Sequence, residues 1–288
     1  MKLTFLLCCI ASTTAEPETL DSDTTSTATK NSKPAAKVQR SADPSKPEPY
    51  SPSRAADLYS TYADDDDQGV IGPEELEKLF GDAGISLEGS LPLLLAWLFG
   101  STEMAKVTKA EWEKGTAGLR ISSLPALSAA LTDLENLLVH DKPPLKPAQT
   151  TPSSKKNTSS SDPYDRSQYF RLAHDPKKAF LEFYLFVYTL SKPPQSRNIE
   201  IETACALWSV ILAPRYPMVD DIISFINEKG TYKAVTKDLW SMMLEFCQTV
   251  SPNLDDYDPE AAWPTLLDDY VSTKKSKVDG APSNANAI

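Results

Sequence analysis

The first residues that could do chemistry lie in the stretch TYADDDDQGVIGPEELEKLF, which covers residues 61–80. Counted as a twelve-residue EF-hand loop, this stretch has Asp64, Asp66 and Gln68 at ligand positions 1, 3 and 5, and Glu75 at the bidentate position 12. Oxygen ligands at this spacing are those that Ca²⁺ takes in proteins. The neutral Gln68 removes one charge from the set, so the loop is a weak candidate for a metal site.

EF-hand loops work in pairs, with the apolar residues of position 8 side by side in a short β-bridge. Ile71 holds that position in the first loop, and Val107 is its predicted partner. Aligned on Val107, the second loop has Gly, Thr and Met where carboxylates would be needed, so it should not bind calcium. We therefore expect the paired frame without dependable calcium binding. A calcium-binding EF-hand adaptor stays the alternative function.

The composition of the chain disfavours some classes of ligand. The chain has 288 residues, of which 41% are hydrophobic, and a net charge of −11. That charge argues against nucleic acid or an anionic membrane as the main ligand, because phosphate groups are bound by clustered Lys and Arg. It suits a basic protein partner.

The four cysteines do not form a recognisable disulfide framework or zinc site. Cys8 and Cys9 are adjacent near the start, and Cys205 and Cys247 lie far apart in apolar helical patterns. No CxxC pair is present, and with only two histidines a His-based catalytic centre is not expected. A cysteine-dependent ligase using Cys205 or Cys247 is disfavoured, because buried structural thiols are inert. We predict no cofactor.

Polar segments divide the chain. Residues 1–50 combine a signal-like start with a Thr-, Ser- and Pro-rich stretch, and 140–168 and 274–288 are also polar. Such segments bury too little apolar surface to offset their ordering entropy, so all three are predicted to be disordered. The ordered regions are then 51–139 and 169–273.

Both ordered regions have helical patterns, with apolar residues at steps of three and four, and no long alternating strand pattern. Thr236 can cap one helix, and Asp258 followed by Pro259 resembles the start of another. The predicted fold is all-α in two lobes. The predicted helices are 53–63, 73–82, 91–100, 109–119, 124–138, 178–190, 199–212, 219–228, 237–250 and 259–271.

The sharpest motifs lie in the second region. VTKDLWSMMLEF (235–246) is followed by YDPEAAWPTLLDDYV (257–271), and FLEFYLFVYTL (180–190) and RNIEIETACALWSVIL (197–212) precede them. Together they resemble the defective-in-cullin-neddylation family, as a fungal-type member, whose shared region is the PONY or DCUN1 domain. The most specific elements are KD-x-W and AWP-x-L-x-DD. An EF-hand-like first lobe without dependable calcium binding is also typical of that family.

The resemblance implies a non-catalytic co-ligase that regulates cullin-RING ubiquitin ligases. Members bind the C-terminal winged-helix region of a cullin and the acetylated N-terminus of the conjugating enzyme (E2) that carries the ubiquitin-like modifier. Bringing the two together favours transfer by proximity and orientation, with no nucleophile from the co-ligase. The modifier itself is then an indirect partner, and we expect a monomer.

The family's functional residues carry over by motif. The acidic cullin-binding patch corresponds to Asp238, Ala262 and Asp268. The pocket for the acetyl-methionine of the conjugating enzyme corresponds to apolar residues of both lobes, as such a slot requires. These are Leu76, Pro92, Leu93, Leu95, Ala96, Phe99, Val107, Leu190, Leu207 and Val210.

The start of the chain conflicts with this pathway. MKLTFLLCCIASTTAEP resembles a secretory signal peptide, with one Lys and an apolar run too short to span a membrane. The absence of a disulfide pattern in the sequence favours an intracellular location for the protein. We therefore expect the protein in the nucleus and cytoplasm.

Overall fold

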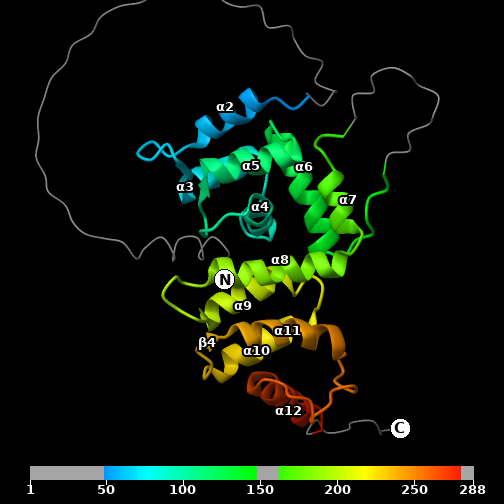
Figure 1. Ribbon diagram of the computed structural model, residues 1–288. Helices are drawn as coiled ribbons and strands as arrows, with labels where there is room; N and C mark the ends of the chain where they lie inside the picture. Colours follow the sequence, from blue (N-terminus) through cyan, green and yellow to red (C-terminus); the bar gives the residue numbers. More distant parts are fainter. Residues whose placement is uncertain (1–48, 148–161, 280–288) are drawn as a thin grey trace, which may run out of the picture.

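The computed structural model describes residues 49–147 and 162–279, and their regular structure is helical apart from two short two-stranded ladders (Figure 1). The all-α prediction is confirmed. Within these two ranges no helix has both the length and the apolarity to cross a membrane. The signal-like start and most of the predicted disordered segments lie outside the described residues.

The N-terminal helix group covers residues 52–139. Several of its helices begin with proline in the first turn, where the missing N–H has no helical partner to lose. Its elements are α2 Pro52–Tyr62, β1 Val70–Ile71, α3 Pro73–Asp82, α4 Leu91–Phe99, β2 Val107–Thr108, α5 Lys109–Leu119, α6 Leu124–Leu134 and the π-helical turn η1 Glu135–Val139.

The C-terminal helix group covers residues 167–279. Its helix α8 lies at the boundary with the N-terminal helix group. It packs against α4 and η1 of that group on one side and against α11 of its own group on the other (Figure 1). The buried side chains of both groups form one continuous core. The elements are α7 Ser167–Ala173, α8 Pro176–Ser191, β3 Ile199–Glu200, α9 Ile201–Ile211, α10 Met218–Lys229, β4 Ala234–Val235, α11 Lys237–Thr249 and α12 Thr265–Asp279.

The predicted pairing of the EF-hand-like loops is present. Strands β1 and β2 run antiparallel, with Ile71 opposite Val107. A second ladder of the same kind joins β3 and β4, with Ile199 opposite Val235. The same number of residues separates the partners in both ladders, and a helix begins within two residues of the end of each strand. The two helix groups therefore contain the same unit, helix–loop–strand–helix taken twice.

A repeated motif follows the second strand of each unit. VTKAEW (107–112) and VTKDLW (235–240) share Val, Thr, Lys and Trp. The Thr hydroxyl of each motif caps the next helix, and each indole N–H donates to a backbone carbonyl of the unit's first helix. The bonds run from Trp112 Nε1 to Ala55 O at 2.9 Å and from Trp240 Nε1 to Tyr184 O at 3.0 Å.

In the C-terminal helix group this bond is part of a buried aromatic network. Tyr184 on α8 donates its hydroxyl to the carbonyl of Trp240 at 2.7 Å and accepts from Trp208 Nε1 at 2.9 Å. The rings of Tyr184 and Trp240 stack at 4.6 Å, and those of Trp208 and Trp240 at 5.5 Å. All the polar atoms of these bonds are paired, which a dry interior requires. The network fixes α8, α9 and α11 relative to one another.

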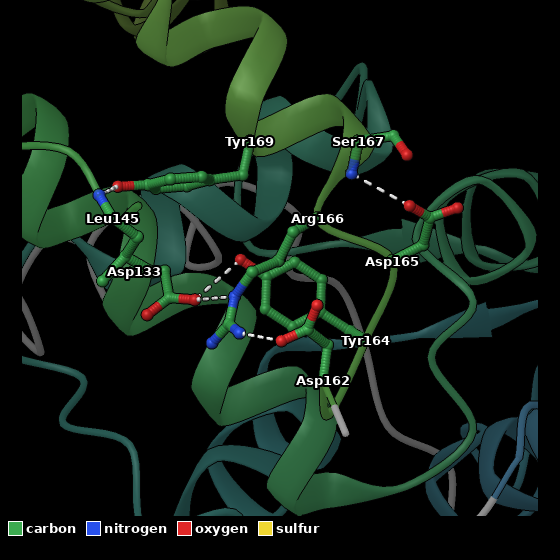
Figure 2. Close-up of polar contacts among 8 residues, drawn as sticks. All are labelled: Asp133, Leu145, Asp162, Tyr164, Asp165, Arg166, Ser167 and Tyr169. Atoms are coloured by element: carbon green, nitrogen blue, oxygen red, sulfur yellow. Dashed lines mark hydrogen bonds and ion pairs between the residues drawn. The ribbon is translucent and has the colours of Figure 1, made fainter. Parts of the chain in front are cut away.

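The flanks of the predicted linker 140–168 are ordered where the structure describes them. Tyr164 is buried, and its hydroxyl donates to Asp133 Oδ2 on α6 at 2.8 Å. The same oxygen is 3.0 Å from Arg166 Nε, and Arg166 also pairs with Asp162 at 2.5 Å (Figure 2). The boundaries predicted for the linker are therefore too wide.

A second set of contacts docks the same segment. The N–H of Leu145 donates to the hydroxyl of Tyr169 at 2.9 Å (Figure 2). The N–H of Asp165 donates to the carbonyl of Leu119 at 2.9 Å. Tyr169 lies in α7, a short helix that the sequence patterns did not predict.

The last helix also differs from its prediction. Asp258 and Pro259 do not start a helix; the Asp258 carboxylate accepts from the N–H of Glu260 in a turn. Helix α12 begins at Thr265, directly after Pro264, because a residue before proline is disfavoured in the helical conformation. It extends past the predicted start of the tail at residue 274, and the Lys274 ammonium pairs with Asp221 of α10 at 2.7 Å.

Replacing Trp240 by Phe should test the buried network. The change removes the indole N–H and part of the ring volume, and we expect a loss of about 2–4 kcal/mol in the free energy of unfolding, measured by urea denaturation. Trp97→Phe is the matched control, because Trp97 is half-buried and contacts Phe183 through its ring at 5.5 Å. A loss for Trp240→Phe no larger than that of the control would contradict the role given to the network.

Candidate functional site

An apolar cavity opens between the two helix groups. Its wall is built by α3, α4, the loop before β2, β2 itself and α9, and it encloses about 570 Å³ of empty space counted out to the solvent at its mouth. Lys106 is the one charged residue in this wall, and its ammonium lies 3.4 Å from Glu103. A cavity so lined suits an uncharged apolar group.

Seven of the residues predicted for the acetyl-methionine pocket lie in the wall of this cavity. They come from both helix groups, as the resemblance implied. They are Leu76, Pro92, Leu93, Leu95, Ala96, Val107 and Leu207.

The other three, Phe99, Leu190 and Val210, are not part of the wall. The reason is clear for Phe99. Its ring lies edge-on to Trp112 at 5.6 Å, and a Cβ atom on Gly115 would come within 2.3 Å of it. The ring of Phe99 therefore packs between α4 and α5, and it fits there because Gly115 has no side chain.

The cavity also has wall residues that the sequence patterns did not indicate: Phe80, Leu87, Met104, Ala105 and Lys106. Three of them immediately precede Val107 in the degenerate second loop, where Ala105 has a positive φ of 57°. Their position next to a predicted wall residue was the available signal. Leu87 lies between two helices and belongs to no periodic pattern.

The loop 64–75 is closed by its own hydrogen bonds. Asp64 Oδ1 accepts from the N–H groups of Asp66 and Asp67 at 2.8 and 2.9 Å, and Gln68 Nε2 donates to the carbonyl of Asp64 at 2.8 Å. In the described residues no cluster of His, Cys, Asp and Glu side chains has the geometry of a metal site. The carboxylates of Glu75 and Asp64 both lie close to Gly72, where an added Cβ atom would be 2.9 Å from Glu75 Oε2 and 3.6 Å from Asp64 Oδ2.

The second loop is closed by the carboxylate at its position 12. Glu111 Oε1 accepts from the N–H of Thr102 at 3.0 Å, and Oε2 accepts from the N–H of Thr108 at 2.8 Å. The Thr108 hydroxyl in turn accepts from the N–H of Glu111, which completes a capping box. This carboxylate therefore ties both ends of the loop to backbone N–H groups.

The three residues predicted to bind a cullin are accessible. Asp238, in the first turn of α11, and Ala262, before α12, are exposed, and Asp268 at the start of α12 is half-buried. Trp263, next to Ala262, packs edge-on against Phe246 of α11 at 5.3 Å. The residue after Ala262 is thus anchored to the helix that has Asp238 in its first turn.

The start of α12 also meets the segment that leads into α11. Asp269 Oδ2 lies 2.5 Å from Lys229 Nζ and accepts from the Tyr232 hydroxyl at 2.7 Å. The hydrogen bond from Lys229 lowers the pKa of Asp269. The neighbouring Asp268 accepts from the hydroxyl of Tyr257 at 2.6 Å. These contacts tie the start of α12 to the segment that leads into α11, the helix with Asp238 in its first turn.

Neither internal cysteine has the setting of a nucleophile. Cys205 and Cys247 are 7% and 6% exposed, and burial raises the pKa of each thiol to about 12. A thiolate is therefore scarce at neutral pH.

A model of the family described as cullin binding matches residues 165–273. DCN1-like protein 4 of Drosophila melanogaster is 28% identical over 222 residues, which cover 77% of this chain and 75% of that protein. DCN1-like protein 4 of Homo sapiens is 28% identical, over 80% of this chain and 65% of that protein. DCN1-like protein 5 of Homo sapiens is 25% identical, over 79% of this chain and 80% of that protein.

The chain is thus similar to the DCN1-like proteins over 77–80% of its length, and its residues 165–273 match the cullin-binding family. The recognition made from the KD-x-W and AWP-x-L-x-DD motifs is thereby confirmed. The matched region 165–273 contains Asp238, Ala262 and Asp268, together with Leu207 at the cavity. The remaining cavity wall comes from the N-terminal helix group, ahead of the match.

Replacing Asp64 by Ala should destabilise the loop 64–75 whether or not calcium is present. Two backbone N–H groups lose their acceptor, and we expect a loss of about 1 kcal/mol in the free energy of unfolding. The measurement is thermal unfolding with calcium and with a chelator. Asp66→Ala is the control, because the bonds given above use the backbone N–H of Asp66 and not its carboxylate. Stabilisation of the wild type by calcium, abolished equally in both variants, would contradict the metal-free role.

Proposed function

We propose that this protein is a non-catalytic co-ligase of cullin neddylation. It binds the winged-helix region of a cullin through Asp238, Ala262 and Asp268, and the acetylated N-terminus of the conjugating enzyme through the apolar cavity. The observation that carries the proposal is the cullin-binding match over residues 165–273, within which these three residues lie accessible.

Charge supports a basic partner at the acidic patch. From Asp238 to Thr273 the sequence has eight Asp and Glu residues and no Lys, Arg or His. Carboxylates facing a basic surface steer association and select the partner. The small side chain of Ala262 adds room for close approach, since a larger group there would stand between the two surfaces.

The character of the cavity supports an acetylated N-terminus as the second ligand. A free α-amino group would carry a positive charge into an apolar wall without a carboxylate to pair with, which is unfavourable. Acetylation removes that charge, and a methionine side chain adapts to an irregular apolar space. The wall residues Leu95, Ala96 and Leu207 supply the apolar surface.

One continuous core supports a positioning mechanism. The cavity wall includes Leu207 of α9, and α9 is tied to α11 through Trp208 and Trp240. Partners held at the cavity and at the start of α11 are thus fixed relative to each other. Holding both partners in this way raises the effective concentration of the conjugating enzyme that carries the modifier at the cullin lysine. The modifier is transferred from the conjugating enzyme, and this protein supplies no nucleophile.

A reconstituted neddylation reaction tests the proposal. Wild-type protein should raise the initial rate of cullin modification, and the double variant Asp238→Ala with Ala262→Arg should lose about tenfold or more of that stimulation, the effect of removing one strong interface contact. Far-UV circular dichroism checks that the variant is folded. Absence of stimulation by folded wild type with every cullin tried would refute the proposed function.

Filling the cavity tests the second binding site separately. Ala96→Met places a longer side chain where the wall is open, and we expect about tenfold weaker binding of an acetylated peptide from the N-terminus of the conjugating enzyme, measured by fluorescence polarisation. Binding of the cullin fragment should be unchanged. Equal peptide affinity for wild type and variant would show that the peptide binds elsewhere.

A further inference from the structure

Two adjacent carboxylates at the start of α12 have different surroundings. Asp269 is 2.5 Å from the ammonium of Lys229 and also accepts from Tyr232, so its charge is balanced inside the chain. Asp268 accepts from the hydroxyl of Tyr257, a neutral donor. Among the residues that the structure describes, Asp268 forms no ion pair, so its charge is left for a partner.

The ring of Tyr257 is itself held in place by two contacts. Phe246 of α11 packs edge-on against it at 6.4 Å, and the ammonium of Lys275 lies over the ring at 5.3 Å. The N–H of Tyr257 donates to the carbonyl of Leu254, a fully buried residue. The position of the hydroxyl is therefore set by the core and not by Asp268.

The turn before Tyr257 is closed as well. Asp256 Oδ1 accepts from the N–H and the hydroxyl of Ser251 at 2.8 and 2.6 Å. Burial and the neighbouring Asp268 raise the pKa of Tyr257 to about 12. The hydroxyl thus stays protonated, and remains a donor, at neutral pH.

We propose that Tyr257 is a positioning residue of the cullin-binding patch, which fixes the orientation of the Asp268 carboxylate before the partner arrives. Tyr257 holds one carboxylate oxygen, Oδ1, and because its hydroxyl is a neutral donor the carboxylate as a whole keeps its negative charge. Fixing a side chain in its bound orientation lowers the entropy lost on binding. The inference rests on the proposed function, since the partner is the basic surface of a cullin.

The test uses Tyr257→Phe, which removes the hydroxyl and keeps the ring between Phe246 and Lys275. The probe is the winged-helix fragment of the cullin that binds the wild type most tightly, and affinity and rates are measured by biolayer interferometry. We expect about three- to tenfold weaker binding, the range for freeing one ordered side chain. The loss should lie in faster dissociation, with association and its salt dependence unchanged because no charge is altered.

Tyr232→Phe is the matched control. It also removes a tyrosine hydroxyl from a carboxylate at the start of α12, but that carboxylate, Asp269, keeps its ion pair with Lys229. We expect cullin affinity to be unchanged in this variant. An equal loss in both tyrosine variants would overturn the proposal, because the effect would then be a general loosening of α12.

A double-mutant cycle with Asp268→Asn separates positioning from a structural role. If Tyr257 acts through the carboxylate of Asp268, Tyr257→Phe should weaken binding further by less than about twofold in the Asp268→Asn background. The full three- to tenfold loss in that background would overturn the proposal, as would unchanged or tighter binding of Tyr257→Phe alone. Failure of the proposed function is distinguishable, because wild type and Asp238→Ala would then bind the cullin fragment equally poorly.

Discussion

The indole N–H groups of Trp112 and Trp240 each donate to a carbonyl in the first helix of their own unit, and the rest of the architecture depends on these two bonds. Each tryptophan follows a strand that is paired to another strand, so the bond fixes the helix after the ladder against the helix that opened the unit. A ladder of two residues per strand could not do this alone, because an isolated short ladder is marginally stable in water. The buried indole supplies the missing constraint.

Helix α8 extends this constraint from one helix group to the other. Its Tyr184 closes the network with Trp208 and Trp240, and its Phe183 meets Trp97 of α4 at 5.5 Å. Helices α4 and α9, which contribute to the cavity wall, and α11, which carries Asp238, are thus joined through two adjacent residues of α8. Partners bound at the cavity and at the start of α11 would be held by one packed core, and such a core has low compressibility. Rigid placement of this kind is what a proximity mechanism needs, and it is built from hydrophobic packing and the four buried hydrogen bonds of Trp112, Tyr184, Trp208 and Trp240.

Sequence patterns predicted the parts of this fold that depend on local periodicity. The all-α class, the opposition of Ile71 and Val107 and the cap at Thr236 follow from residue spacing alone. The patterns failed where distant contacts decide: Tyr164 is ordered by Asp133 on α6, and polar neighbours hide it in the sequence. For the cavity, the resemblance indicated Leu76 on α3 and the wall residues on α4, but not Phe80 of α3. The sequence could not distinguish Phe99 from these wall residues, because the position of its ring depends on the close approach of Gly115.

The repeated motif explains why the acidic patch lies in the C-terminal helix group alone. In VTKAEW the acidic residue is Glu111, whose carboxylate is used inside the loop by the N–H groups of Thr102 and Thr108. In VTKDLW the equivalent position is Leu239, half-buried against the core, and the acid stands one residue earlier. A shift of one residue on a helix turns a side chain by about 100°. Asp238 therefore faces solvent where Glu111 faces its own loop, and the same frame that closes a loop in one unit presents a charge in the other.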